Sequence, residues 1–313
     1  MDTDLLNEKL YIDGKQIDID NYRVIKLLGY GANADVYLVK NTLLLRLEAM
    51  KVWKPRKRMQ TVDATRFKSE VIKNSKFSHP NIAAFYHAGI YSGSYIAFLE
   101  YCKGTTLEEY MRNAPSYLNR LSLLYQIAWT MNTVYACGCY HGDLHSKNIL
   151  VDCEKIKILD FGTSIFAHSA EDSHKRDAKM LYQLSIEVLP ELKSFTFYSE
   201  KMIEKPSIDI CNCILGLIYL LCFEANDSGD QPFDSYLIIL AEIMFSCPGF
   251  DLNEVIEYVH DDRFIEILNL CEQKKSEIIK NYKESTKSLG SNIEQLISEY
   301  NSIIFSRESF KTI

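Results

Sequence analysis

The chain has no hydrophobic run long enough to indicate a membrane span. Its longest run, from Ile210 to Phe223, covers fourteen residues and contains Asn212. A transmembrane helix needs about 20 predominantly apolar residues, so this run predicts a buried helix and no membrane partner. The segment from Met1 to Asn7 is acidic and has no apolar core, so we expect no secretory signal.

Cysteine pairs at the spacing of zinc sites are also missing. The nine cysteines include no C-x-x-C motif, and the two C-x-C pairs, Cys137/Cys139 and Cys211/Cys213, lie in apolar runs. Paired C-x-x-C motifs mark zinc sites, whereas scattered cysteines in apolar runs are typical of reduced proteins. We therefore expect buried free thiols, no zinc and a cytoplasmic location.

The chain also has no excess of positive charge, since 42 Asp and Glu outnumber 35 Lys and Arg. The formal net charge is −7, which argues against non-specific binding to nucleic acid. One local exception is the basic run from Lys54 to Arg58, which we interpret as a solvated connection between a strand and a helix. A hydrophobic content of 47% and a charged content of 25% are those of a folded globular protein.

The most informative stretch that is present is HGDLHSKNIL, from His141 to Leu150. Asn148 follows Asp143 by five residues, and Asp160-Phe161-Gly162 begins seventeen residues after Asp143. Phosphoryl transfer with Mg²⁺ uses one carboxylate to orient the attacking hydroxyl. An amide and a second carboxylate hold the metal that bridges the phosphates. The order and spacing predict this chemistry, with Asp143 as the base and Asn148 and Asp160 as the ligands of Mg²⁺.

Three further elements of such a site lie upstream. The run LGYGANADVYLV begins at Leu28, and its glycines Gly29 and Gly31 allow the backbone to approach phosphates closely. Lys51 lies in a strand-like run, where its ammonium would contact the α- and β-phosphates. Glu70 follows nineteen residues later, which is a separation that matches an ion pair with Lys51.

Hydrophobic periodicity predicts strands in the first third of the chain and helices afterwards. Asp13-Gly14 indicates a hairpin within Leu10–Ile19, and a helix is expected from about Asp63 to Lys76, before Pro80. Further strands are expected at Tyr22–Leu28, Asp35–Val39, Leu47–Val52, Ile82–Gly89 and Tyr95–Glu100. A short helix from Thr106, a long one from Tyr117 to Cys137, and a strand pair at Ile149–Val151 and Ile156–Leu159 would follow.

With these elements in this order, the chain from about Tyr22 to Phe166 resembles the protein kinases of the eukaryotic-like type. The HGDLHxxN form is similar to bacterial kinase-like proteins. The resemblance implies an α+β, two-lobed fold with an antiparallel β-sheet N-lobe and a mostly helical C-lobe. We expect the N-lobe with its N-terminal hairpin at 1–99, a hinge at 100–104, and the C-lobe with a divergent C-terminal helical region at 105–313.

The resemblance also implies a site for ATP and Mg²⁺. Lys51 resembles the family's strand lysine, Glu70 its helix partner, Asp143 the catalytic base, and Asn148 and Asp160 the metal ligands. Leu99 lies at the gatekeeper position, and adenine would bind backbone groups from Glu100 to Cys102. The remaining nucleotide contacts would come from Leu28, Gly29, Gly31 and Val36.

The chain departs from the family pattern at several positions. Ala34 replaces the third glycine of the phosphate loop, and we expect Asp35 beside it to point to solvent. Gly142 replaces an arginine that normally receives an activation-loop phosphate, which predicts activity without that phosphorylation. His145 replaces a lysine that steadies the γ-phosphate, so we assign that contact either to His145 or to Lys147.

No Ala-Pro-Glu motif follows Asp160, and two interpretations remain open. In the favoured one the activation segment is truncated and a helix begins near Ser173, running through Leu181, Leu184 and Leu189. In the other, Tyr198-Ser199-Glu200 is a degenerate form of the motif. Both leave the apolar run that ends at Phe223 as a buried helix.

The leading hypothesis is an ATP-dependent protein kinase that phosphorylates serine or threonine of a protein substrate. A second hypothesis keeps the chemistry and changes the acceptor to a small molecule, such as an aminoglycoside or an amino alcohol. It is motivated by the HGDLHxxN form and by the missing Ala-Pro-Glu. A third hypothesis is a nucleotide-binding scaffold without activity, which a missing Lys51, Asp143 or Asn148 would have favoured.

Overall fold

A computed structural model of the chain describes residues 3–55, 64–75, 78–161, 170–195, 198–199 and 209–227. Contacts divide the chain into two compact units, residues 1–214 and residues 215–313. The first unit carries all the elements that position the candidate site. The division into 1–99, 100–104 and 105–313 that the sequence suggests stays a prediction.

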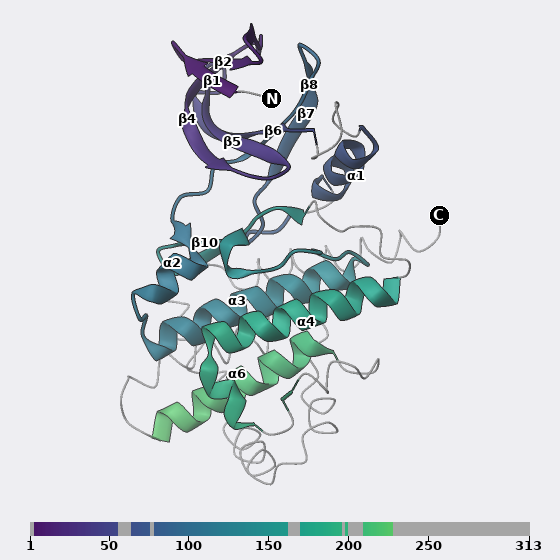
Figure 1. Cartoon of the computed structure of the whole chain (residues 1–313). Helices are drawn as coiled ribbons and strands as arrows, with labels where there is room; N and C mark the ends of the chain where they lie inside the picture. Colours follow the sequence, from purple (N-terminus) through teal and green to yellow (C-terminus); the bar gives the residue numbers. More distant parts are fainter. Residues whose placement is uncertain are drawn as a thin grey trace, which may run out of the picture. The chain divides into compact units, whose positions relative to one another are not determined.

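The N-terminal region is built on a five-stranded antiparallel sheet (Figure 1). Strands β5 and β6 are rich in branched and aromatic residues, and Val39, Met50 and Val52 are fully buried in its core. The predicted strands are confirmed, although β7 begins three residues after the expected Ile82. The strand order is β4-β5-β6-β8-β7, with β4 at Tyr22–Tyr30, β5 at Ala34–Asn41, β6 at Arg46–Trp53, β7 at Phe85–Tyr91 and β8 at Ser94–Glu100.

A small three-stranded sheet precedes this one, formed by β1 (Thr3–Leu6), β2 (Lys9–Ile12) and β3 (Lys15–Gln16). The turn between β2 and β3 is the predicted Asp13-Gly14, with φ of 49° and 76°. Both residues are in the left-handed region that this two-residue hairpin turn requires. Leu10, Ile12 and Ile17 are buried in the same core cluster as Phe98 of the larger sheet.

One helix, α1 (Ala64–Asn74), packs on the sheet through Phe67 and Val71. These two side chains lie in a cluster with Trp53 at the end of β6 and Ala97 of β8. The helix confirms the prediction, while Asp63, its expected first residue, lies outside the described residues. The packing fixes the face of α1 that carries Glu70.

The following region is mostly helical, as predicted. Thr106 caps α2 (Leu107–Arg112), with the reciprocal bonds to Glu109 that make a capping box. The long helix α3 (Tyr117–Ala136) buries one face of apolar side chains. Between α3 and α4 lie the short 3₁₀ helix η1 (Ser146–Asn148) and the hairpin of β10 (Ile149–Asp152) and β11 (Lys155–Ile158), with β9 (Thr105–Thr106) pairing to β10.

The helix α4 (Ala170–Val188) runs beside α3 (Figure 1). It starts three residues before the predicted Ser173 and ends one residue before Leu189. A continuous helix over this stretch supports the truncated activation segment. In the other interpretation, with the degenerate Ala-Pro-Glu at Tyr198, α4 would lie within the activation segment.

The last described elements are η3 (Pro190–Ser194) and α6 (Ile210–Asp227). The predicted buried helix is confirmed, since its residues from Ile210 to Leu217 are all buried. Among the described residues, no helix is both long enough and apolar enough to cross a membrane.

The cysteines agree with the sequence analysis only in part. Cys211, Cys213 and Cys222 are buried, and none of the seven described cysteines forms a disulfide. Cys137, however, is exposed and Cys139 is only half-buried. The expectation that these two are buried is wrong, because both lie just beyond the last residue of α3 rather than on its apolar face.

Candidate active site

A cavity of about 590 Å³ brings together the residues that the sequence singles out. This volume is in the range of sites that bind a cofactor or drug-sized ligand. Three sets of residues line it: the phosphate loop, the hinge and the predicted catalytic groups. The predicted members are Leu28, Gly29, Gly31, Val36, Lys51, Glu70, Glu100, Cys102, Asp143, Lys147, Asn148 and Asp160.

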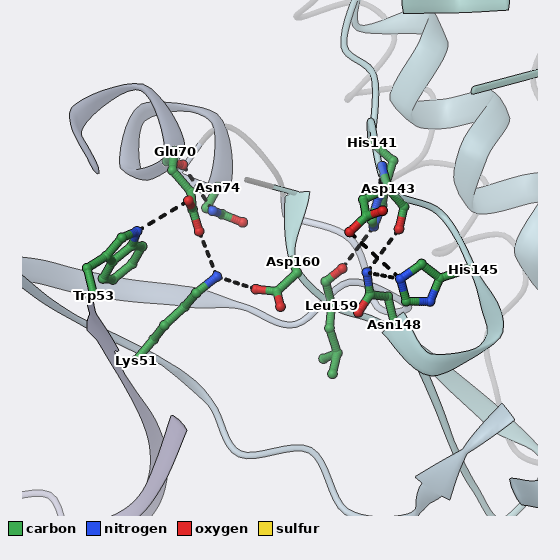
Figure 2. Close-up of polar contacts among 10 residues, drawn as sticks. All are labelled: Lys51, Trp53, Glu70, Asn74, His141, Asp143, His145, Asn148, Leu159 and Asp160. Carbon is green, nitrogen blue, oxygen red and sulfur yellow. Dashed lines mark hydrogen bonds and ion pairs between the residues drawn. The ribbon is translucent and has the colours of Figure 1, made fainter. Parts of the chain in front are cut away.

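Lys51 lies at the centre of the charged part of this cavity (Figure 2). Its Nζ is 2.7 Å from Glu70 Oε1 and 2.5 Å from Asp160 Oδ1. Burial lowers the pKa of the Lys51 ammonium, but Asp160 and Glu70 raise it more, so the net pKa lies above the ordinary value. Lys51 in turn holds the pKa of Asp160 below its ordinary value. Lys51 and Asp160 are therefore both charged at neutral pH.

Asp160 is held in an unusual backbone conformation. Its φ is +59°, in the left-handed region that costs a non-glycine residue on the order of 1–3 kcal/mol. The next residue, Phe161, is 1% exposed, and its ring centroid lies 4.7 Å from that of His141. Buried Phe161 thus anchors the chain on one side, while the strained residue points its carboxylate to Lys51.

The catalytic loop is held by bonds among its own residues (Figure 2). Asn148 Nδ2 donates to the backbone oxygen of Asp143 at 2.9 Å and lies 3.2 Å from His145 Nε2. His145 Nδ1 accepts from the backbone N–H of Lys147 at 3.2 Å. These contacts orient the Asn148 amide and leave its oxygen as the ligand atom. The geometry gives His145 a role within the loop, 3.7 Å from the Asp143 carboxylate.

Lys147 lies at the rim of the cavity. Its side chain is 67% exposed, and its Nζ is 3.6 Å from Glu108 Oε1 on α2. An exposed pair at this distance contributes little to stability, because solvent screens it and both side chains lose rotamer freedom. The Lys147 ammonium is therefore open to solvent at the edge of the cavity.

His141 and Asp177 support the loop from beneath. Asp177 on α4 is fully buried, and its carboxylate accepts from the backbone N–H of His141 at 2.5 Å and of Gly142 at 2.7 Å. His141 Nδ1 accepts from Asp143 N–H at 3.2 Å, and Nε2 bonds to the oxygen of Leu159 at 2.8 Å. Burial lowers the pKa of His141 to about 4, so the ring is neutral. Sequence reasoning did not identify Asp177.

Glu100, Tyr101 and Cys102 of the hinge line the cavity. The Glu100 carboxylate accepts from Lys157 Nζ at 2.8 Å and from Ala84 N–H at 3.0 Å. Cys102 Sγ lies 3.6 Å from the backbone oxygen of Glu100. Burial and then Glu100 raise the pKa of the Cys102 thiol to about 12, so it is protonated.

Gly31 is required by close backbone contact in the phosphate loop. Its N–H donates to Ala34 oxygen at 2.9 Å, and a Cβ at Gly31 would lie 2.7 Å from that oxygen. Any other residue would push the turn open. Ala34 itself is buried at the start of β5 and pairs with Trp53 of β6.

The expectation that Asp35 points to solvent is wrong. Asp35 is fully buried and forms an ion pair with Lys54, the residue that follows β6. Lys54 N–H also donates to Asn33 oxygen at 2.8 Å, and its Nζ lies 5.6 Å from the centroid of the Tyr30 ring. Lys54 therefore contacts the phosphate loop and is not part of a solvated connection. Residues 56–58 of the basic run lie outside the described residues.

Replacing Lys54 with methionine should destabilise the fold by about 3 kcal/mol, because it leaves the buried Asp35 carboxylate without its cation. The double variant Asp35→Asn with Lys54→Met removes both charges and should recover most of that loss. Urea unfolding of the three proteins measures the difference. Equal stability of the wild type and the single variant would contradict the buried pair.

The residues fit a bound nucleotide with Mg²⁺. Asp160 offers a carboxylate and Asn148 an oriented amide oxygen, which are ligands that Mg²⁺ takes. Lys51 offers a cation for phosphates, and the backbone of the phosphate loop lines the same cavity as the hinge. These donors match both the metal and the triphosphate it accompanies.

Comparison with known proteins points to the same family. The family model described as protein kinase domain matches residues 22–225. The chain is 32% identical over 151 residues to the probable serine/threonine-protein kinase PknB of Lactococcus lactis. This alignment covers 47% of the chain and 24% of the relative. The chain is 30% identical over 164 residues to the serine/threonine-protein kinase PrkC of Bacillus subtilis, which is 51% and 25%.

The chain thus spans about a quarter of the length of these curated relatives. Among solved structures, the PknI kinase domain of Mycobacterium tuberculosis matches with a TM-score of 0.51 and 16% identity. That match covers 64% of this chain and 94% of the solved chain, and at this identity it shows the fold alone. The structure has the protein kinase fold, with an antiparallel β-sheet in its N-terminal region and a helical C-terminal part. The family model matches most of the chain. The chain therefore belongs to the protein kinase family.

Proposed function

We propose that the chain is an ATP-dependent protein kinase that transfers the γ-phosphate to serine or threonine of a protein. The observation that carries the proposal is the cluster of Lys51, Glu70 and Asp160 in one cavity with Asp143 and Asn148. The names of the bacterial relatives, both serine/threonine-protein kinases, support the choice of acceptor.

Most of the catalysis would be positioning and electrostatic stabilisation. Bound ATP with Mg²⁺ supplies the phosphoryl group and neutralises part of the phosphate charge. The Lys51 ammonium, held by Glu70, would contact the α- and β-phosphates. Asn148 and Asp160 would hold the metal, and the backbone of the phosphate loop would cover the phosphates.

Asp143 would orient the acceptor hydroxyl and accept its proton as the hydroxyl oxygen bonds to the γ-phosphorus, while the bond from that phosphorus to the bridging oxygen breaks and ADP leaves. Its carboxylate is 42% exposed, so an acceptor can reach it from solvent. Lys147 at the rim supplies the positive charge for the γ-phosphate, while His145 orders the loop through its bonds to Lys147 and Asn148.

The test is transfer of label from γ-labelled ATP to a general protein substrate with Mg²⁺, followed by phosphoamino-acid analysis. The proposal predicts labelled phosphoserine or phosphothreonine. Label that never enters protein, with ATP still bound, would contradict the proposed acceptor.

Dephosphorylated enzyme should keep its transfer rate within about twofold, because Gly142 offers no side chain to receive an activation-loop phosphate. Gly142 instead has φ of +82° and donates its N–H to Asp177, so loop order rests on that bond. Phosphatase treatment followed by an initial-rate assay measures this. Loss of activity that returns after rephosphorylation would contradict the prediction.

A second candidate function is phosphorylation of a small molecule such as an aminoglycoside or an amino alcohol. The observation in its favour is that residues 161–169 alone connect Asp160 to α4, whose Asp177 holds the catalytic loop. This leaves little chain for a platform that binds a peptide. Label in an aminoglycoside or in choline, with none in protein, would favour this candidate.

A further inference from the structure

We propose that Trp53 is a positioning residue for phosphoryl transfer, whose indole N–H holds one oxygen of Glu70 so that the other oxygen faces Lys51. The proposal rests on the proposed function for its effect on activity. It states that Trp53, a residue of the N-terminal region, helps to position Lys51 through Glu70. Its geometric part is independent of the acceptor.

The Glu70 carboxylate is held at both oxygens by the same strand (Figure 2). Trp53 Nε1 donates to Oε2 at 3.4 Å, and Lys51 Nζ donates to Oε1 at 2.7 Å. Lys51 and Trp53 are two residues apart on β6, so their side chains leave the same face of the sheet. Glu70 is 2% exposed, and water therefore cannot easily replace a lost partner.

Trp53 also fixes the helix that carries Glu70. Its side chain is 3% exposed, and its ring meets that of Phe67 edge to face, with centroids 5.0 Å apart and planes at 87°. Phe67 lies three residues before Glu70 on α1, so both point from one face of the helix. A single side chain thus sets the position of α1 by packing and the orientation of its carboxylate by a hydrogen bond.

This orientation matters most when a nucleotide is bound. Lys51 now contacts both Glu70 and Asp160. With Asp160 as a metal ligand, Glu70 would be the carboxylate that still holds Lys51. A carboxylate that is already fixed at its second oxygen loses less conformational entropy when it orients the lysine. This arrangement needs no phosphate on the activation segment.

The first test compares Trp53→Phe with Trp129→Phe. Phenylalanine keeps an aromatic ring against Phe67 and loses the N–H. Trp129 on α3 is the second of the two tryptophans, packs against His79 and Tyr125, and does not line the cavity. We expect kcat/KM for ATP to fall about tenfold in Trp53→Phe, because a buried hydrogen bond to a charged group is lost. Trp129→Phe should match the wild type.

A double-mutant cycle separates positioning from general packing. If Trp53 acts through Glu70, adding Trp53→Phe to Glu70→Gln should lower kcat/KM by less than about twofold further. Independent, additive losses would overturn the proposal, as would a Trp53→Phe enzyme with wild-type kinetics.

Affinity for a fluorescent ATP analogue gives a readout that does not need transfer. Weaker binding in Trp53→Phe, and unchanged binding in Trp129→Phe, supports the proposal even if no acceptor is ever phosphorylated. Unchanged binding in both overturns it. If Trp53→Phe does not fold, Trp129→Phe leaves Trp53 as the one tryptophan, and its emission should shift to shorter wavelength when Glu70→Leu removes the acceptor. No shift would overturn the proposal.

Discussion

Replacing Asp177 with alanine should cost the fold several kcal/mol and disable the catalytic loop. The buried carboxylate accepts from two backbone N–H groups, and its removal leaves both donors without a partner. Each unsatisfied buried donor costs on the order of 1–3 kcal/mol, so the two together cost about 2–6 kcal/mol, a large part of a typical domain's stability of about 5–15 kcal/mol. Burial raises the pKa of Asp177, and the two N–H bonds act against that rise.

Urea unfolding and initial rates measure the effect of Asp177→Ala. The matched control is Asp177→Asn, whose amide keeps one acceptor oxygen and turns a donor toward the second N–H. It should lie between the wild type and the alanine variant in both measurements. An alanine variant as stable and as active as the wild type would show that the loop is held in another way.

Replacing Asp143 with asparagine should lower the rate of transfer by roughly 10³-fold, because the amide keeps the shape but cannot accept the proton of the hydroxyl. Binding of ATP should stay near the wild-type value, since Lys51, Asn148 and Asp160 are unchanged. The side chain is 42% exposed, so the fold should not suffer.

A matched control for this variant is Asp152→Asn, an exposed aspartate at the end of β10 in the hairpin that follows the catalytic loop. It should transfer phosphate at the wild-type rate. Single-turnover measurements at saturating ATP make the comparison independent of binding. An Asp143→Asn enzyme that retains a tenth or more of the wild-type rate would contradict the assignment of the base.

The parts of the site that the sequence predicts are those that local motifs specify. Asp143 and Asn148 lie five residues apart in one loop, and Asp160 follows the next hairpin, so their convergence follows from the chain itself. The Lys51–Glu70 pair joins a strand to a helix, yet its spacing was sufficient, and the structure shows the ion pair. Phosphoryl transfer requires these residue types, and the sequence motif therefore predicts the site.

The residues that support the site were harder to predict. Asp177 bonds to the loop across more than thirty residues, and a helical Asp is usually solvated. A signal was nevertheless present: Asp177 falls on the same helical stripe as Leu181, Leu184 and Val188, where a charge is out of place. An aspartate on an apolar stripe needs buried donors, and the catalytic loop provides them.

The burial of Asp35 was difficult to predict for a related reason. An acidic side chain beside a phosphate-facing loop is expected to point away from the phosphates. Because aspartate is mostly exposed in proteins, solvent is the expected environment. The structure buries it because Lys54, just past the paired strand, lies within reach. Strand register decides this contact, since Ala34 pairs with Trp53 and brings the two charges to the same end of the sheet. Register depends on the whole sheet and cannot be read from either segment alone.

Phosphorus NMR of the purified chain with ATP, Mg²⁺ and a protein rich in serine and threonine tests the central claim most directly. The account predicts that the γ-phosphate signal of ATP declines while a phosphomonoester signal of the protein grows, with little inorganic phosphate. Inorganic phosphate alone would mean hydrolysis without an acceptor, and an unchanged ATP spectrum would mean that no phosphoryl group is transferred. Either of these two results would contradict the account.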